Sequence, residues 1–286
     1  MPIVRYLLSL FLTLFFITGL FAQEKYYPPK TPWHLADIWW EAKSETKNFQ
    51  TLSMDFEIIG KTSKDTLLFI APIGLSKLNG ISFYGGIQTK VGGWKTKQNK
   101  TVKTVGKGTI FSRWSKDENP IGLEYAKGNA TTHFLSAGYE GNFVSVRNAL
   151  NWEEGKYQYR IKKLETTQDK GEVFTWFGAY VYDYAMQQEH YIGALKFAGE
   201  TFVYGKKHAA FVEVYGALNK SAIPQITVAF EVPKINGQKW NVTKAKVYYP
   251  SNKYKAKVIP RFAHAQVKEN KVIMVSVPQG VNALVK

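Results

Sequence analysis

Short runs of alternating apolar and polar residues, separated by turn residues, repeat along this chain at intervals of about 8 to 14 residues. Such alternation is typical of β-strands with one buried face, and its regular recurrence indicates an all-β sandwich or barrel. Apolar residues nowhere keep helical spacing over three turns, so helices should be few and short. The predicted strands are Leu52–Ile59, Thr66–Ala71, Ile81–Thr89, Gly108–Trp114, Ile121–Tyr125, Thr131–Tyr139, Phe143–Ala149, Tyr157–Leu164, Val173–Tyr182, His190–Phe197, Ala210–Tyr215 and Ile226–Val232.

The pattern predicts one β-sandwich domain over residues 33–232, with short helices at Ile38–Lys43 and Asp183–Gln188 as the best helical candidates. From Pro233 onward lysine becomes more frequent and large aromatic residues become rarer. Residues 233–286 are either a small C-terminal β appendage or the closing hairpins of the same sandwich, and the pattern leaves both alternatives open.

The amino terminus resembles an export signal, because Arg5 precedes an apolar run from Leu7 to Leu20. We expect cleavage after Ala22, so that residues 1–22 form the signal peptide and the proline-containing residues 23–32 an extended lead-in. An uncleaved anchor is the alternative. No later run is long enough to span a membrane. The chain is therefore expected to be exported, to a periplasm, a cell surface or the medium, and it carries no signal for an oligomeric state.

The formal net charge of +16 comes mainly from lysine, which is concentrated between Lys90 and Lys107 and again between Lys244 and Arg261. Nucleic-acid binding is not expected, because no recognition helix, zinc finger or RNA-binding motif accompanies the charge. The excess is interpreted as a solvated basic face, or as attraction to acidic glycans or an anionic envelope.

The sequence lacks the residues and motifs that several kinds of chemistry require. The chain has no cysteine, so it has neither disulfides nor a thiol nucleophile. Its five histidines do not have metal-binding spacing, and no nucleophile elbow, phosphate loop or dinucleotide motif is present. We therefore expect no metal ion and no cofactor. Glycan cleavage stays open, by paired acids or by arginine and tyrosine groups, but nothing in the sequence pairs the acids.

Segment Ala137–Arg160 combines sheet-like alternation with an unusual polar and aromatic cluster. We expect a strand over Phe143–Ala149, a turn over Trp152–Gly155 and a return strand, which would bring the cluster together on one folded sheet. The segment is then either a set of paired charges holding the sandwich together or the floor of a ligand site. The cluster consists of Glu140, Arg147, Trp152, Tyr157, Tyr159 and Arg160.

Strand Val173–Tyr182 is predicted to have one wide aromatic face. Alternation places Phe174, Trp176, Tyr180 and Tyr182 on that face, and Thr175, Phe177, Ala179 and Val181 on the other. Aromatic rings of this kind either fill a core or stack on sugar rings.

Five segments of the chain resemble, in their order along the sequence, the motifs of the exported bacterial domain-of-unknown-function family 3472. That family shows an F-G-I-Q strand, an I-x-F-S-x-W strand, an E-G-x-G-x-x-S turn leading to W-x-x-G-x-x-Y, and a late F-x-E motif. The segments are Ile81–Thr89 (ISFYGGIQT), Gly108–Trp114 (GTIFSRW), Ala137–Arg160, Trp176–Asp183 (WFGAYVYD) and Phe211–Gly216 (FVEVYG).

The resemblance covers roughly Trp33–Gly216 and implies an antiparallel, concanavalin-like or jelly-roll β-sandwich, a fold often found in carbohydrate-handling bacteria. It implies no established activity and no catalytic residue. The chain departs from the family at Glu140-Gly141-Asn142, where the glycine-rich turn is reduced, and at Tyr84-Gly85-Gly86.

Together these observations predict an exported β-sandwich protein that binds carbohydrate or envelope glycan. The alternatives are a glycan-cleaving enzyme, either a glycoside hydrolase or a polysaccharide lyase, and a structural envelope protein without a small ligand. The candidate ligand-binding residues are Glu140, Arg147, Arg113, Trp114, Gln88, Trp176, Tyr180 and Asp183.

Overall fold

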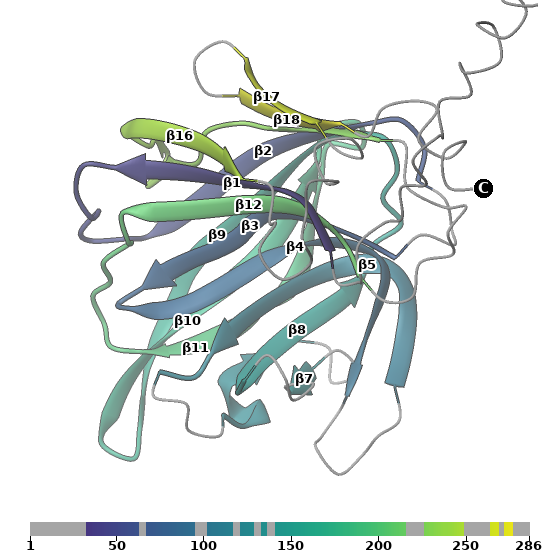
Figure 1. The fold of residues 1–286 in the computed structure, drawn as a ribbon. Coiled ribbons are helices and arrows are strands. Elements are labelled where there is room, and N and C mark those ends of the chain that lie inside the picture. The colour runs from purple at the N-terminus through teal and green to yellow at the C-terminus, as the bar shows by residue number, and fades with distance from the viewer. Residues whose placement is uncertain are drawn as a thin grey trace, which may run out of the picture.

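The computed structural model is an antiparallel β-sandwich, which confirms the all-β fold class (Figure 1). It describes residues 33–62, 67–94, 102–116, 121–128, 133–135, 141–215, 226–248, 264–268 and 272–276. The predicted signal peptide and lead-in, residues 1–32, lie outside these ranges. Within the described ranges, the one helical element is a 3-10 turn, η1 (Leu123–Tyr125), in place of the strand predicted at Ile121–Tyr125.

The first sheet has eight strands in the order β16-β1-β12-β3-β4-β5-β8-β7. Their bounds are β16 Val242–Tyr248, β1 Trp33–Ala42, β12 Lys207–Val214, β3 Leu68–Leu78, β4 Ile81–Trp94, β5 Val102–Trp114, β8 Phe143–Ala149 and β7 His133–Leu135.

The second sheet has ten strands, eight of them in the order β17-β18-β13-β2-β9-β10-β11-β6, and β14 joins it by pairing with β2 and with β15. The bounds are β17 His264–Lys268, β18 Val272–Ser276, β13 Thr227–Phe230, β2 Thr51–Ile59, β9 Gly155–Asp169, β10 Glu172–Asp183, β11 Gln188–Ala198, β6 Ala126–Lys127, β14 Lys234–Ile235 and β15 Gln238–Lys239. Strands after Pro233 thus pair within both sheets.

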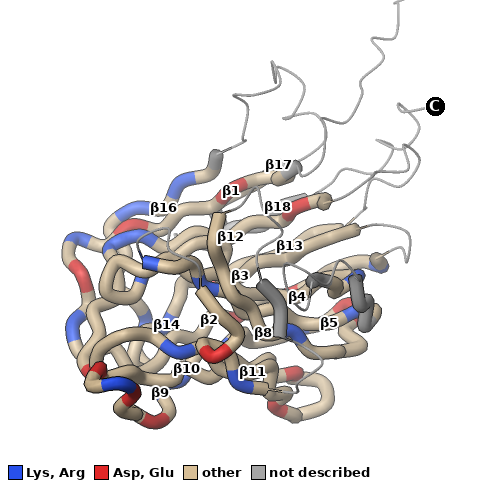
Figure 2. The backbone as a smooth tube through the Cα atoms, turned by 90° about the horizontal axis from the view of Figure 1, so that it is seen from below, with Lys and Arg blue, Asp and Glu red and all other residues tan. Residues whose placement is uncertain are grey.

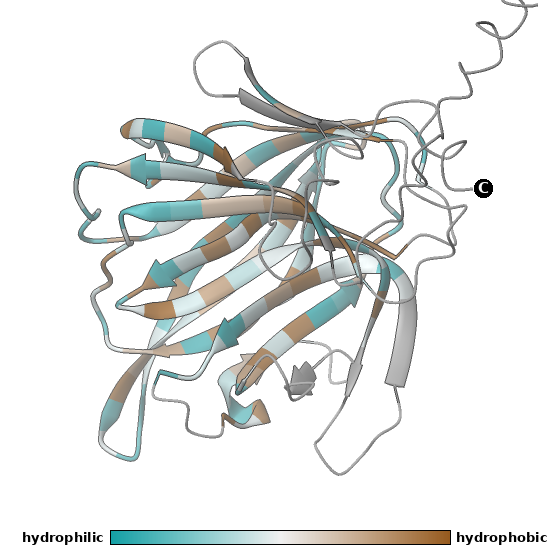
Figure 3. Ribbon diagram, viewed as in Figure 1, coloured by the Kyte–Doolittle hydropathy of each residue, from teal (hydrophilic) through white to brown (hydrophobic). Residues whose placement is uncertain are grey.

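The core lies between the two sheets and is built from the inward residues of each alternating strand (Figure 3). Both sheets contribute large aromatic rings, and Phe83 of β4, for example, meets Phe197 of β11 edge-on at 6.3 Å between ring centroids. Burial of such rings dominates the stability of a sandwich. The largest fully buried side chains are Trp40, Trp152, Tyr159, Tyr204, Phe49, Phe56, Phe83, Phe111, Phe177, Phe197 and Phe202.

Both predicted helices are wrong. Ile38–Lys43 falls largely in β1, which pairs with β12 on one side and β16 on the other, so backbone pairing and burial of Ile38 and Trp40 outweigh local preference. Asp183–Gln188 contains the turn between β10 and β11. The Asp183 carboxylate accepts hydrogen bonds from the amides of Ala185 (2.8 Å) and Met186 (3.1 Å), which stabilises that turn.

The expected hairpin around Trp152 is also wrong, because β8 lies in the first sheet and β9 in the second. Residues 150–154 cross from one sheet to the other. Trp152 is fully buried at this crossing, and its indole N–H donates to the Gln88 carbonyl oxygen at 3.0 Å. Arg147 and Arg160 consequently lie on opposite outer faces of the sandwich and do not form one cluster.

Tyr159 connects the two sheets through the core. Its hydroxyl, carried by β9 of the second sheet, donates to the Ile110 carbonyl oxygen of β5 in the first sheet at 2.7 Å. The ring passes over Gly85 of β4, where an added Cβ would lie 2.3 Å from the hydroxyl oxygen. Glycine is therefore required at this position for the tyrosine to reach across.

This contact predicts that Gly85→Ala lowers the free energy of unfolding by about 1–3 kcal/mol through overpacking, and Tyr159→Phe by about 1 kcal/mol through the lost hydrogen bond. Urea denaturation measures both. Gly205→Ala is the matched control, because its Cβ would meet Lys77 at an ordinary 3.5 Å. Equal losses in the Gly85 and Gly205 variants would contradict the proposed contact.

Candidate functional site

The outer face of the second sheet is shaped by alternation along β9. Tyr157, Tyr159 and Ile161 point into the core, so the residues between them face outward. The outward residues of β9 are Lys156, Gln158, Arg160 and Lys162. Pairing then places Ser53 and Asp55 of β2 on one side of this row, and Tyr180 and Tyr182 of β10 on the other.

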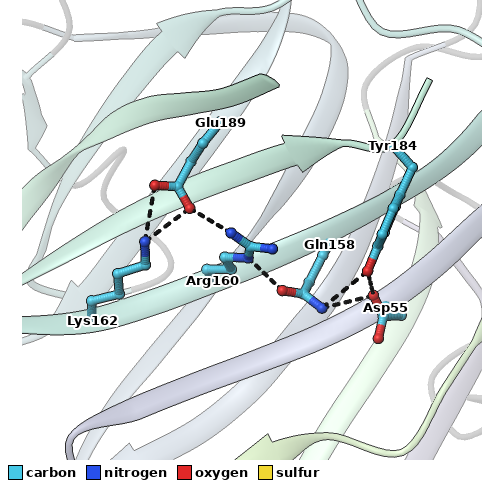
Figure 4. Close-up of polar contacts among 6 residues, drawn as sticks. All are labelled: Asp55, Gln158, Arg160, Lys162, Tyr184 and Glu189. Carbon is cyan, nitrogen blue, oxygen red and sulfur yellow. Dashed lines mark hydrogen bonds and ion pairs between the residues drawn. The ribbon is translucent and has the colours of Figure 1, made fainter. Parts of the chain in front are cut away.

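A continuous chain of polar contacts crosses this face from β11 to β2 (Figure 4). Lys162 and Arg160 both bind the Glu189 carboxylate, Arg160 also donates to the Gln158 side-chain oxygen, and the Gln158 amide donates to Asp55 at 2.8 Å. Every one of these groups has a partner of complementary character, so the row is fixed in one arrangement.

Asp55 is the most buried acid of the chain of contacts, with 3% of its surface exposed. Its carboxylate accepts hydrogen bonds from the Tyr184 hydroxyl (2.5 Å), Gln158 (2.8 Å) and the Lys234 ammonium (2.9 Å). Burial by itself would raise the pKa of Asp55, but these three donors outweigh it and hold the pKa below its usual value. Asp55 is therefore charged at neutral pH and holds Tyr184, Gln158 and Lys234 in place.

At the other end of the chain of polar contacts, the Glu189 carboxylate accepts three hydrogen bonds. Arg160 Nη1 lies 2.8 Å from Oε1, and Lys162 Nζ lies 2.9 Å from each carboxylate oxygen. Burial raises the pKa of Glu189, but the two cations outweigh that effect and lower it. The side chains of Arg160, Lys162 and Glu189 are 26%, 37% and 30% exposed, so solvent reaches this fork of donors and acceptor. We call these three residues the Glu189 fork.

Four tyrosines surround the fork and form what we call the tyrosine patch: Tyr180, Tyr182, Tyr184 and Tyr191. They make two ring pairs, Tyr180 with Tyr191 at 5.2 Å and Tyr182 with Tyr184 at 5.1 Å. Lys162 lies over Tyr180 at 4.6 Å and Arg160 over Tyr182 at 4.5 Å. These cation–π contacts hold the rings and cations in place relative to each other.

The other half of β10, around Phe174 and Trp176, is covered by neighbouring side chains. Phe174 and Trp176 are each only 5% exposed. Lys127 lies over Trp176 at 4.2 Å, and Lys196 lies over Phe174 at 4.6 Å and over Tyr125 at 4.8 Å. The predicted assignment of Val173–Tyr182 side chains to two faces is thus confirmed. Of the aromatic face, only Tyr180 and Tyr182 have rings that solvent reaches.

The sequence-predicted candidates do not form one site. Trp176 and Tyr180 lie on the outer face of the second sheet, and Asp183 stabilises the β10–β11 turn. Gln88, Trp114 and Arg147 lie on the opposite outer face, that of the first sheet, where Arg147 donates to Ser145 at 3.1 Å.

The two remaining candidates are Arg113 and Glu140. Arg113 is buried, donates to the carbonyl oxygens of Trp114 (3.1 Å) and Lys196, and packs on Phe197. Burial lowers its pKa to about 10. Glu140 lies outside the described residues.

Several central residues were missed by the sequence reasoning, namely Asp55, Gln158, Lys162 and Tyr184. The alternation of Lys156, Gln158, Arg160 and Lys162 with Tyr157, Tyr159 and Ile161 was a readable signal for an outward polar row. No local pattern pointed to Asp55, because it reaches Gln158 only through the pairing of β2 with β9.

The arrangement favours binding over acid–base chemistry. A glycosidase needs one carboxyl group kept protonated, whereas the pKa values of both Asp55 and Glu189 are lowered. Among the residues that the structure describes, no group of three or more histidine, aspartate or glutamate side chains is arranged to hold a metal ion. Within the same ranges, no helix has the length and apolarity to cross a membrane.

The Asp55 contacts predict a pH-dependent loss of stability in Asp55→Asn. At neutral pH the variant should lose about 1–3 kcal/mol of unfolding free energy, because three donors lose a charged acceptor. Since the folded pKa of Asp55 lies below the unfolded value of 3.8, this contribution is complete above about pH 5 and disappears as the pH falls through the folded pKa. Denaturation at several pH values measures the difference. A pH-independent difference would show that Asp55 acts through packing alone.

Comparisons with known proteins find no family model and no curated protein that matches the chain. Membership in family 3472 therefore stays a prediction. Two solved crystal structures of scytalido-glutamic peptidase match at 11% identity, one with a transition state analog inhibitor and one with a peptide based transition state analog. Each match covers 87% of this chain and 99% of the peptidase chain, with TM-scores of 0.38 and 0.35. A likeness this distant says nothing about the chemistry of either face.

Proposed function

We propose that this protein binds carbohydrate on the outer face of its ten-stranded sheet, through the tyrosine patch and the Glu189 fork. The observation that carries the proposal is the combination of accessible rings with accessible charged donors and an acceptor in one place. Tyr184 and Tyr191 are 38% and 41% exposed. Each pairs with a tyrosine whose ring lies under a cation of the fork.

Aromatic rings bind sugars because the C–H face of a pyranose ring packs against the flat π-face of the aromatic side chain. Tyrosine suits an accessible site of this kind, since its ring is apolar while its hydroxyl remains solvated. The cation–π contacts of Lys162 and Arg160 orient these rings before a ligand arrives, which reduces the entropy cost of binding.

The Glu189 fork supplies the directional contacts. Each sugar hydroxyl is both a donor and an acceptor. Neighbouring hydroxyls can therefore donate to Glu189 while accepting from Arg160 or Lys162, and hydrogen bonds to charged groups are stronger than those between neutral groups. Arg160 is held in position by its hydrogen bond to Gln158, which in turn is hydrogen-bonded to Asp55.

We also propose that the protein is exported, as the Leu7–Leu20 run before Ala22 predicts. An exported protein with such a face would meet glycans of an envelope or of the surroundings. Glycan cleavage is not part of the proposal, because Asp55 and Glu189 both favour their charged form. A structural role without a ligand is an outcome of the experiment below.

The proposal predicts that Tyr191→Ala weakens glycan binding about tenfold, because a stacking ring is lost. A glycan array first identifies a ligand, and calorimetric titration then compares the variants. Ile59→Ala is the matched control, since Ile59 is a similarly exposed apolar residue, 47%, at the end of β2.

Two outcomes would contradict the proposal. Absence of wild-type binding across a broad panel of neutral and acidic glycans would remove the carbohydrate function and favour the structural role. Equal affinities of the Tyr191 and Ile59 variants would place the binding surface elsewhere. Assays for reducing ends and for unsaturated products on the same panel would reveal cleavage.

A further inference from the structure

The tyrosine patch is electrically balanced, although the whole chain carries a formal charge of +16. Four basic side chains and four acidic ones lie around it, and most are joined in ion pairs. Figure 2 shows the same mixture as blue and red segments around β2, β9 and β11 (Figure 2). The basic residues are Lys156, Arg160, Lys162 and Lys234, and the acidic residues are Asp55, Glu57, Glu189 and Glu231.

Each of these four cations is engaged by a carboxylate. Glu189 engages Arg160 and Lys162 together, Asp55 engages Lys234 at 2.9 Å, and Glu231 engages Lys156 at 3.1 Å. An acidic sugar that approached Arg160 or Lys162 would have to compete with Glu189 and would be repelled by it. Like-charge contacts of this sort discriminate against a ligand more sharply than missing contacts do.

We infer that the patch selects an uncharged oligosaccharide over an acidic one, an inference that rests on the carbohydrate-binding function proposed above. The chain's positive excess lies outside the patch and does not define the ligand. Uncharged hydroxyls use the donors and the acceptor of the Glu189 fork at once, whereas a carboxylate-bearing sugar uses only the donors.

The two ring pairs indicate a ligand of more than one sugar. Tyr180 and Tyr182 occupy successive outward positions of β10, about 7 Å apart along the strand. Each belongs to a different pair, with Tyr191 and Tyr184 respectively. A chain that stacks on both pairs must therefore contain at least two linked sugars, with the fork between them.

Calorimetric titration with hexasaccharides of matched length tests the inference. Cellohexaose, maltohexaose and xylohexaose are the neutral probes, and hexagalacturonate is the acidic probe. At physiological ionic strength we expect at least one neutral probe to bind about tenfold or more tighter than hexagalacturonate. Its affinity should change less than about twofold when the salt is raised to about 1 M, because no net charge is neutralised on binding.

Glu189→Gln gives the sharper result. The substitution keeps the shape and an acceptor but removes the charge that engages Arg160 and Lys162. We expect affinity for the neutral probe to fall several-fold and affinity for hexagalacturonate to rise several-fold, with a new dependence on salt. Glu41→Gln is the matched control, since Glu41 pairs with Lys207 in the first sheet at 3.5 Å and its side chain is 31% exposed, close to the 30% of Glu189.

The outcomes separate the inference from the function on which it rests. Tighter wild-type binding of hexagalacturonate, falling steeply with salt, would overturn the inference and leave carbohydrate binding in place. So would equal behaviour of the Glu189 and Glu41 variants. Failure of every glycan to bind would overturn both. Unfolding curves for each variant confirm that the proteins compared are folded.

Discussion

The hydrogen bond from Tyr159 to the Ile110 carbonyl oxygen is the contact on which the outer face depends. It joins the two sheets across the core at 2.7 Å and requires glycine at position 85. Because side chains alternate along a strand, a β9 whose Tyr159 points inward must present Gln158 and Arg160 outward. A slip of one residue along β9 would bury the charged side chains of Arg160 and Lys162 and would expose Tyr159.

The polar row inherits its order from this constraint. Gln158 bonds Asp55 on one side and Arg160 on the other, so the buried acid of β2 and the exposed fork near β11 belong to one arrangement. The ion pairs that fix the row also neutralise it. The same contacts therefore give the face its rigidity and its proposed preference for uncharged ligands.

Much of the fold could be predicted from local pattern, because strand alternation survives in a single sequence. The two faces of β10 followed directly from the positions of Phe177 and Tyr180. Long-range pairing could not be predicted. Neither the separation of β8 from β9 into different sheets nor the meeting of Asp55 with Gln158 leaves a local trace. Candidates chosen by residue type, such as Arg147 and Trp176, were consequently distributed over two faces.

The most direct measurement is a titration of the isotope-labelled protein with the best-binding oligosaccharide, followed residue by residue by nuclear magnetic resonance. If the ligand binds as proposed, the largest changes will fall on Tyr180, Tyr182, Tyr191 and Glu189. The opposite face, at Gln88, Trp114 and Arg147, will remain unchanged. Changes confined to that opposite face, with the tyrosine patch undisturbed, would contradict the account.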